Sequence, residues 1–466
     1  MNKEILYRPL TEIASLIQSR QVSCEDVVLG YIERAKRLKR LNAYITLDEE
    51  GSITAARQLD AEIADGNVRG PLHGIPIAVK DQFDVSGLPT TLGGNITRDI
   101  AESDATAVSR LRAAGAIILG KLNLSEYALG GNISHAYGVP RNPWDETRQA
   151  GQSSSGSGVA TAASLAAATL GGDTAGSIRG PAAWCGIVGL RPTWGRVSRN
   201  GAFPMAWFMD TIGPMTKTVE DAAAIFEVIA GHDPKDPYTS QQPVTTFHPI
   251  DDLNGLRIGL VQESIEQGMA GAAQAEAVYK ALEVLGVAGA EIGQASLPLF
   301  DRGGLIANSL ADTEAAYTHR KWLREFPEKY DFATRRRLMA SSLISGVTYV
   351  KLSRFRSLMR QDVMNELDRF DLLITPTQAE PAPPIATETG FTSKEAVMRQ
   401  FFGLRGHRSP FNLSGVPALA VPCGFSENGL PLSMQLVAKP FSENLLFSVG
   451  RLYQNLTDWH EHRPSV

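Results

Sequence analysis

The sequence predicts an α/β protein built on one large β-sheet. Short segments rich in β-branched and other apolar residues recur along the whole chain, and segments with apolar residues at helical spacing lie between them. Such alternation is typical of a sheet covered by helices. The composition agrees, because 43% hydrophobic and 20% charged residues over 466 positions are usual for a soluble globular protein. No internal repeat is visible.

The charge balance and the cysteines argue against several classes of protein. A net charge of −5 gives no electrostatic reason to expect a nucleic acid or an anionic membrane as partner. The N-terminus mixes charged and apolar residues, unlike a signal peptide, and no apolar run approaches the length of a membrane span. Cys24, Cys185 and Cys423 lie far apart, which argues against a disulfide framework and a cysteine zinc site. We therefore expect a cytoplasmic protein without metal or other cofactor.

The first part of the chain is predicted to be helical. Apolar residues at helical spacing over 9–38 predict two helices, and residues 51–65 predict a third. Ser23 and Asp26 form a capping-box pattern in front of the second helix, with aspartate in place of the commoner glutamate.

A short buried strand follows, because β-forming residues flank a proline over 75–81 (IPIAVKD). Residues 104–114 then predict a helix and residues 116–119 a strand. The run 115–121 has the spacing of a phosphate-binding loop. We reject that interpretation because Leu122 stands where serine or threonine is required and the intervening residues are strand-like.

The stretch from 151 to 191 concentrates the residues that suggest chemistry. Ser153, Ser154 and Ser155 lie in a glycine-rich turn, an Ala-rich run over 159–170 predicts a helix, and a second glycine-rich turn leads to Ser177. Dense glycine lets a backbone approach a ligand closely. The pattern favours a serine nucleophile with an oxyanion hole over a flexible linker, because Gly/Ser linkers do not usually contain a helical Ala/Leu/Val run.

The second half of the chain predicts further strands and helices in alternation. In chain order the expected elements are a helix opening at 218–221, a surface segment at 232–254, a strand at 256–261, helices at 270–286 and through much of 311–370, a strand at 371–377, a loop at 378–390, strands at 418–425 and 432–438, and a helix at 442–457.

A serine nucleophile in this chain needs a base other than the common ones. The sequence contains no G-x-S-x-G, no S-x-x-K and no H-E-x-x-H pattern. Lys80 is the candidate, because it ends an apolar strand and burial lowers the pKa of a lysine. A lysine that extends its amine from the strand end to water fits the same position.

Three segments resemble the amidase signature family of Ser–cis-Ser–Lys hydrolases. They are IPIAVKD at 75–81, GQSSSGSG at 151–158 and GGDTAGSIRGPAAWCGIVGLRPT at 171–193. The 24-residue interval from Ser153 to Ser177 equals the family interval, and similarity continues through MDTIGPM, LLITPT, SGVPALAVPCGF and LPLSMQL. The resemblance covers nearly the full length.

The resemblance implies one amidase signature domain over residues 1–466, with a single large mixed sheet covered by helices on both faces. Its helical N-terminal part would span 1–70 and its signature core 71–220, and the remainder would complete the sheet and the substrate cleft.

The resemblance also implies a role for each residue of the triad. Ser177 is expected to be the nucleophile, and Ser153 the bridging serine in a cis peptide after Gln152. Lys80 is expected to accept the proton, supported by a hydrogen bond from Ser154.

The same family pattern implies residues around the triad. Backbone N–H groups of Thr174, Ala175, Gly176 and Ser177 are expected to form the oxyanion hole. Asp173 and Arg179 would orient the turn, unless they form an ordinary surface pair. The residues expected to bind substrate are Leu129, Gly130, Gly131, Gln152, Trp207 and Phe208. The last two suit an apolar or aromatic group.

The chain departs from the family pattern at three positions, where Gln152, Ser155 and Ala175 replace glycines. A side chain at Ala175 keeps the N–H donor but narrows the allowed φ. Because the triad is retained, we expect activity to persist and acyl-group specificity to differ.

The expected function is therefore hydrolysis of a small carboxylic amide through a seryl acyl-enzyme, with release of ammonia or an amine. The expected partner is the small-molecule amide, and a homodimer is left open. One alternative is hydrolysis of carboxylated ureas of the biuret or allophanate type, whose anion requires a cation such as His319, Arg320 or Arg336. Another is the glutaminase component of a tRNA-dependent amidotransferase, although residues 317–356 look more like stand-alone amidases.

Overall fold

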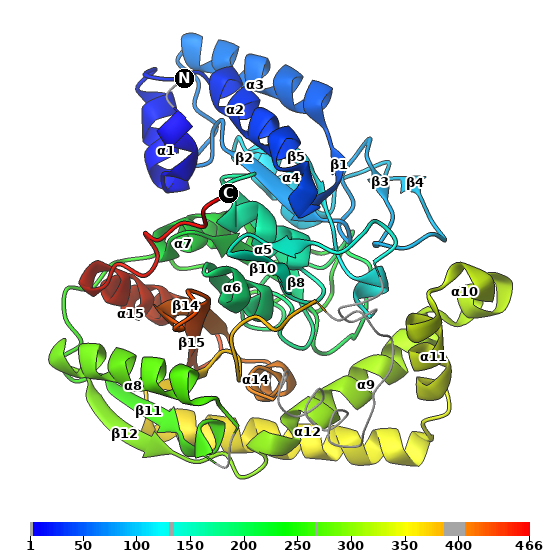
Figure 1. The fold of residues 1–466 in the computed structure, drawn as a ribbon, viewed down its shortest axis with the longest axis vertical. Coiled ribbons are helices and arrows are strands. Elements are labelled where there is room, and N and C mark those ends of the chain that lie inside the picture. The colour runs from blue at the N-terminus through cyan, green and yellow to red at the C-terminus, as the bar shows by residue number, and fades with distance from the viewer. Residues whose placement is uncertain (1–2, 130–134, 267–268, 386–405) are drawn as a thin grey trace.

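The computed structural model describes residues 3–129, 135–266, 269–385 and 406–466. An 11-stranded mixed sheet runs through the molecule in the order β1-β5-β2-β8-β10-β9-β14-β15-β13-β11-β12 (Figure 1). Helices flank this sheet, so the predicted α/β fold is confirmed.

The strands of the sheet are β1 Tyr44–Leu47, β2 Pro76–Lys80, β5 Ile117–Leu122, β8 Ala168–Asp173, β9 Val188–Arg191, β10 Thr211–Thr216, β11 Arg257–Val261, β12 Glu291–Ala295, β13 Leu372–Pro376, β14 Ala418–Phe425 and β15 Pro431–Ala438. Two small ribbons pair β3 Pro89–Thr90 with β4 Asp99–Ile100, and β6 Arg141–Asn142 with β7 Asp145–Gln149. Strand β2 runs parallel to β5 and β8, and β11 runs parallel to β12 and β13, whereas the other pairs of the large sheet are antiparallel.

The helices are α1 Leu10–Gln18, α2 Cys24–Arg37, α3 Glu49–Ala64, α4 Thr106–Ala113, α5 Ser155–Ala162, α6 Arg179–Cys185, α7 Val219–Ile229, α8 Ala272–Val287, α9 Gly303–Thr318, α10 Arg320–Glu325, α11 Phe332–Ser341, α12 Gly346–Arg369, α14 Ser409–Ser414 and α15 Glu443–Leu456. Helices α4, α7, α15 and α8 adjoin one another in a layer, and α5 packs against α6 over the central strands. Figure 1 shows α9, α10 and α11 at the lower right and the long α12 along the bottom of the molecule.

Local sequence explains where several helices begin. The Ser23 hydroxyl accepts the Asp26 N–H at 3.0 Å, which confirms the predicted cap of α2. The Thr218 side chain accepts the Asp221 N–H at 3.1 Å in the same way at the start of α7. Each cap satisfies a backbone donor that the first helical turn leaves unpaired.

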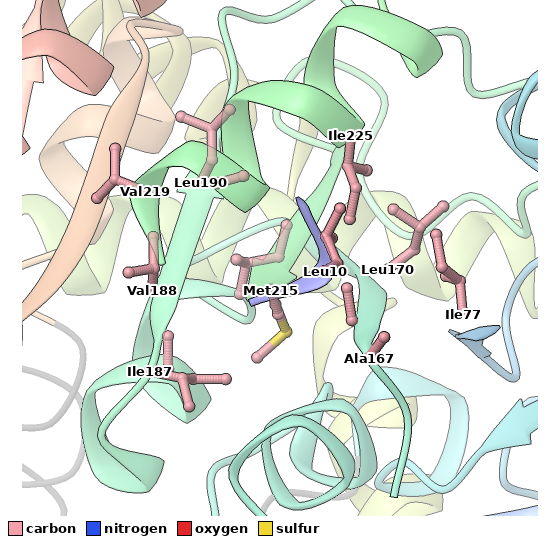
Figure 2. Close-up of a cluster of buried hydrophobic side chains, with 14 of the residues drawn as sticks. Leu10, Ile77, Ala167, Leu170, Ile187, Val188, Leu190, Met215, Val219 and Ile225 are labelled. Atoms are coloured by element: carbon pink, nitrogen blue, oxygen red, sulfur yellow. The ribbon is translucent and has the colours of Figure 1, made fainter. Parts of the chain in front are cut away.

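The main core lies between the central strands and the helices that cover them. Figure 2 shows side chains from β2, β8, β9, β10, α7 and α1 meeting in one cluster; its labelled residues are Leu10, Ile77, Ala167, Leu170, Ile187, Val188, Leu190, Met215, Val219 and Ile225. All of them are at most 3% exposed. Strand β2, which ends at Lys80, lies between β5 and β8 and is buried on both faces.

The predicted helix over 159–170 is wrong in its second half. Helix α5 spans Ser155–Ala162, and the chain then enters β8 at Ala168. Alanine favours helix locally, but pairing of β8 with both β2 and β10 overrides this propensity. Strand β8, and not a continuous helix, therefore delivers the second glycine-rich turn.

The rejected phosphate-binding loop is confirmed to be a strand. Residues 117–122 form β5 between β1 and β2. Lys121 has no exposed side chain and lies 2.8 Å from Asp81 in a buried ion pair. The Lys121 charge is therefore used in a buried ion pair with Asp81 and not in binding a phosphate.

Candidate active site

Lys80 ends β2 and lies with 1% of its surface exposed. Its Nζ donates to the Ser153 hydroxyl oxygen at 2.9 Å. Burial lowers the pKa of Lys80 from 10.5 to about 7, against the opposing effect of the Asp210 and Asp173 carboxylates. A lysine whose amine reaches water is therefore excluded, and the amine can act as a base near neutral pH.

Ser153 lies in the tight turn that enters α5. Gly151 has φ +132°, and a Cβ there would lie 2.5 Å from Pro181, so the turn requires glycine. The structure has a trans peptide between Gln152 and Ser153, contrary to the expectation of a cis bond. Trans is the lower-energy form of a non-prolyl peptide, and the contact between Ser153 and Lys80 forms with it.

Ser154 does not contact Lys80 as expected. Its hydroxyl donates to the Gly172 carbonyl oxygen at 3.2 Å, and it is completely buried. Ser154 occupies the N-cap position of α5, but its side chain makes no capping hydrogen bond and bonds to β8 instead. Ser154 therefore ties the first glycine-rich turn to the strand that leads to the second.

Ser177 lies half-buried in the turn between β8 and α6. Within the described residues its hydroxyl has no hydrogen-bond partner. Gly176 takes φ +99°, and a Cβ at this position would collide with Arg408. Ala175, which replaces a family glycine, is not among the residues with positive φ, so its methyl group causes no backbone strain.

One of the expected oxyanion donors is occupied. The Gly176 N–H donates to Asp173 Oδ1 at 2.8 Å. The N–H groups of Ala175 and Ser177 have no such partner in the part of the chain that the structure describes. The turn therefore keeps free donors on either side of Gly176.

Asp173 and Arg179 form a buried ion pair, with Arg179 Nε 3.1 Å from Asp173 Oδ2 and neither side chain exposed. The alternative of an ordinary surface pair is excluded. Arg191 approaches the same carboxylate at 3.3 Å, and Asn412 donates to it at 2.6 Å. Burial opposes ionisation of Asp173, but Arg179 and Arg191 outweigh it and hold its pKa well below the usual range.

Asp173→Asn is expected to lower the free energy of unfolding by about 3–5 kcal/mol, because two buried guanidinium groups lose their counter-charge. The folded-state pKa of Asp173 lies below the unfolded one. The stabilisation is therefore present at neutral pH and is lost as the pH falls through the folded value. Urea unfolding at pH 7 measures the change. Asp301→Asn, which breaks a surface pair with Arg302, should cost less than about 1 kcal/mol, and an equal cost for both variants would contradict the prediction.

An inner cavity of about 220 Å³ borders the turn from the side of Thr174. Its residues are Gln82, Gly172, Asp173, Thr174, Arg199, Asn200, Ala202, Phe203, Pro204, Trp207, Asp210, Thr211, Ile212, Lys235, Asp236 and Pro237. Lys80, Ser153 and Ser177 are not among the residues that line this cavity, whereas Asp173 and Thr174, which lead into the turn of Ser177, are.

The residues expected to bind substrate are only partly brought together. Trp207 lines the inner cavity and, with Phe208, an outer apolar groove of about 670 Å³ that also contacts α9 and α12. Leu129 is instead buried in an aromatic cluster, and Gln152 lies in the first turn outside the cavity. Residues 130 and 131 lie outside the described residues.

The cations suggested for a carboxylated urea do not face the inner cavity. His319 is buried against aromatic rings, and burial lowers its pKa to about 4. Arg320 and Arg336 lie at the surface over Tyr317 and Phe332. The cations on the cavity are Arg199, paired with Asp236, and Lys235 at the rim.

Sequence reasoning missed several residues that hold the site. Arg191 donates to the Asp173 carbonyl at 2.6 Å, and Gln435 accepts from Arg179 at 2.8 Å. Both lie in segments that resemble the family, but no spacing rule connects them to Ser177. Among the described residues, no group of three histidine, cysteine, aspartate or glutamate side chains is arranged to hold a metal ion, and no helix is long and apolar enough to cross a membrane.

Comparisons with known proteins place the chain among its relatives. A family model described as Amidase matches residues 26–447. The A subunit of glutamyl-tRNA(Gln) amidotransferase from Gloeobacter violaceus is 37% identical, with 98% of each chain covered. A solved structure described as a vestigial protein complex that reveals the evolutionary origins of an s-triazine catabolic enzyme superposes with a TM-score of 0.90 at 33% identity, covering 98% of this chain and 100% of that one. Peptide amidase PAM in complex with chymostatin gives 0.87 at 29% identity, with 98% and 99% covered.

The fold and these relatives define an amidohydrolase that acts on carbon–nitrogen bonds of amides. The chain belongs to the Amidase family, the amidase signature enzymes, and the resemblance seen in its sequence is confirmed.

Proposed function

We propose that this protein hydrolyses the carbon–nitrogen bond of a small carboxylic amide through an acyl-enzyme on Ser177. The observation that carries the proposal is the buried Lys80, whose pKa is lowered to about 7 and whose Nζ lies 2.9 Å from Ser153 Oγ. A serine hydroxyl is a poor nucleophile until a positioned base removes its proton, and this pair supplies a base without histidine.

The reaction would proceed in two halves. Ser153 passes the Ser177 proton to neutral Lys80 while Ser177 Oγ bonds to the amide carbon. The proton then returns through Ser153 to the leaving nitrogen, the carbon–nitrogen bond breaks, and ammonia or an amine departs. Water attacks the acyl-enzyme with the same base and releases the carboxylic acid. Because the Ser177 hydroxyl has no partner in the described residues, its contact with Ser153 would form when substrate binds.

The turn after β8 would stabilise the oxyanion. Free N–H groups at Ala175 and Ser177, within the described part of the chain, suit this role, with Thr174 beside them, whereas Gly176 N–H serves Asp173. Asp173 and Arg179 would keep the turn rigid. One correctly placed donor contributes about 2.7–4 kcal/mol to transition-state stability.

An apolar part of the substrate fits the neighbouring walls. Phe203, Ile212 and Trp207 line the inner cavity, and Trp207 is 44% exposed where the inner cavity meets the outer groove. Apolar pockets with a few polar groups are the usual sites for small molecules. The substrate proposed is therefore an aliphatic or aryl amide of small size.

Trp207→Ala is expected to raise KM for an aryl amide by about 10-fold and to change KM for acetamide little. The substitution removes an apolar contact that contributes roughly 1–3 kcal/mol to binding of the aryl group. Steady-state kinetics with both substrates measure the split. Tyr279→Ala, at an exposed aromatic on α8, is the control and should change neither value. Equal effects of Trp207→Ala on both substrates would refute a specificity role.

The proposed function is tested by ammonia release from the purified chain with aliphatic amides, aryl amides, glutamine and biuret as substrates. Turnover of an aliphatic or aryl amide that is lost in Ser177→Ala supports it. Turnover of biuret alone would favour the biuret and allophanate class of substrate, and Arg199 and Lys235 are the cavity cations that could bind the carboxylate of allophanate.

A second candidate function rests on the similarity to the A subunit of glutamyl-tRNA(Gln) amidotransferase, 37% identical over 98% of the chain. In that case the chain would release ammonia from glutamine for use by a partner protein. If the chain alone is inactive with every amide, and is active on glutamine only after co-expression with the other components of such an enzyme, this function replaces the stand-alone proposal.

A further inference from the structure

Asp210 connects two parts of the site that are far apart in sequence. It directly precedes β10 and lines the inner cavity. Its Oδ1 accepts the Thr174 hydroxyl at 2.6 Å, and Thr174 belongs to the turn that carries Ser177. Its Oδ2 accepts the N–H groups of Met205 and Ala206 at 2.8 and 2.9 Å. One carboxylate therefore holds both the nucleophile turn and the loop that walls the cavity.

The loop that walls the cavity, residues 203–210, is here called the cavity loop, and it is also fixed at its other side. The Trp207 N–H donates to Glu314 of α9, and Tyr349 of α12 donates to the same carboxyl group at 2.9 Å. The loop from 203 to 210 is thus held between two carboxylates, of which only Asp210 contacts the turn among the described residues. A shift of Asp210 would move Thr174 and the cavity wall together.

Asp210 also acts on the base. The Asp210 and Asp173 carboxylates are the charges that raise the pKa of Lys80 against its burial. Three charged groups interact with Asp210. The charge of Arg199 lowers the pKa of Asp210, and the charge of Asp210 raises the pKa values of Arg191 and Glu314. Burial raises the pKa of Asp210, and the donated hydrogen bonds from Thr174 and the two backbone N–H groups oppose this effect.

We propose that Asp210 is a positioning residue for amide hydrolysis, which fixes the Thr174 side of the nucleophile turn against the cavity loop and keeps a negative charge beside Lys80. This inference rests on the proposed function of Ser177 and Lys80. It needs no contact between Asp210 and the substrate.

Two substitutions separate the two effects. Asp210→Asn removes the charge and changes the hydrogen bonds, whereas Thr174→Val removes only the hydroxyl donor and keeps the charge and the backbone N–H. Both are expected to lower kcat by about 10- to 100-fold with little change in KM, since a misplaced oxyanion donor weakens transition-state binding. The double variant should lose less than the product of the single losses, because both act through one hydrogen bond.

The pH dependence of kcat distinguishes positioning from general damage. Activity requires neutral Lys80, so it rises with pH through the pKa of this lysine. Without the Asp210 charge the ammonium form of Lys80 is less favoured. The acid limb of the pH profile, where kcat rises with pH, should therefore move to lower pH in Asp210→Asn. The limb of Thr174→Val and of the surface control Asp301→Asn should stay in place.

The outcomes are separable from those of the proposed function. If the wild type hydrolyses amides and Ser177→Ala does not, but Asp210→Asn keeps a normal kcat and an unmoved acid limb, the role of Asp210 is refuted alone. If Asp210→Asn fails to fold, an unchanged kcat in Thr174→Val refutes the role just as well. Retention of activity in Ser177→Ala would instead overturn the proposed function.

Discussion

Ser177→Ala is expected to lower kcat by about 10⁴-fold or more, to the limit of detection of ammonia release. The change removes the atom proposed to bond to the acyl carbon, and losses of this size are typical when a serine nucleophile is deleted. The Ser177 hydroxyl makes no hydrogen bond in the described residues, so its loss should leave the free energy of unfolding within about 0.5 kcal/mol of wild type.

Mass spectrometry gives this prediction a second measurement. With a slowly deacylated ester or amide, the wild type should gain the mass of the acyl group and Ser177→Ala should not. Ser342→Ala, at an exposed position after α11, is the matched control and should keep both turnover and acylation. An acyl group that still attaches to Ser177→Ala would place the nucleophile elsewhere, with Ser153 the first serine to examine.

The fold class and the elements that carry Lys80, Ser153 and Ser177 could be predicted from the sequence. The strand ending at Lys80 can be predicted because its residues are β-forming and apolar. The turns are readable because glycine and serine cluster there. The structure then adds the 2.9 Å contact that joins Lys80 on β2 to Ser153, 73 positions away.

Strands rich in glycine and proline could not be predicted in this way. Strand β10 (TIGPMT) and the end of β8 (ATLGGD) contain residues that are poor strand formers. They form strands because each is paired within the sheet, and such pairing depends on residues distant in sequence. Local propensity therefore misplaced the end of the Ala-rich run.

The residues that hold the nucleophile turn in place could not be predicted from the sequence either. Asn412 donates to Asp173 across 239 positions, and Asp210 accepts from Thr174 across 36. No periodicity relates these residues. Asp210 comes near Thr174 because β10, which follows Asp210, pairs with β8, and Asn412 reaches Asp173 from helix α14. The expected hydrogen bond from Ser154 to Lys80 is absent, although Ser154 directly follows Ser153. Two adjacent residues can point their side chains in different directions, so the position of Ser153 does not predict the contacts of Ser154.

The burial of Lys80 explains why the site places carboxylates nearby without pairing it directly. A full ion pair within 4 Å favours the ammonium form of a lysine, and Asp81 acts on Lys121 in this way from 2.8 Å. Lys80 instead makes its hydrogen bond to neutral Ser153, while Asp210 and Asp173 act on it as charges from beyond hydrogen-bonding distance. This arrangement leaves the pKa near neutrality, where a base is most effective.

Lys80→Ala is therefore expected to lower kcat by about 10³-fold, within the 10²- to 10⁴-fold range of a general base. In the wild type, kcat should fall with a midpoint near pH 7 and then about tenfold for each further unit of acid, because only neutral Lys80 accepts the proton. The residual rate of the variant should lack this limb. Lys80→Met keeps more of the buried volume and serves where the alanine variant is unstable.

Lys217 provides the decisive control, because burial also lowers its pKa to about 7, while its Nζ donates to the Leu6 carbonyl at 2.7 Å near the N-terminal helix and away from the triad. Lys217→Met should keep both the rate and the acid limb of the wild type. If the limb instead disappears in Lys217→Met and persists in Lys80→Met, the titration reports the docking of the N-terminal segment, and Lys80 is not the base.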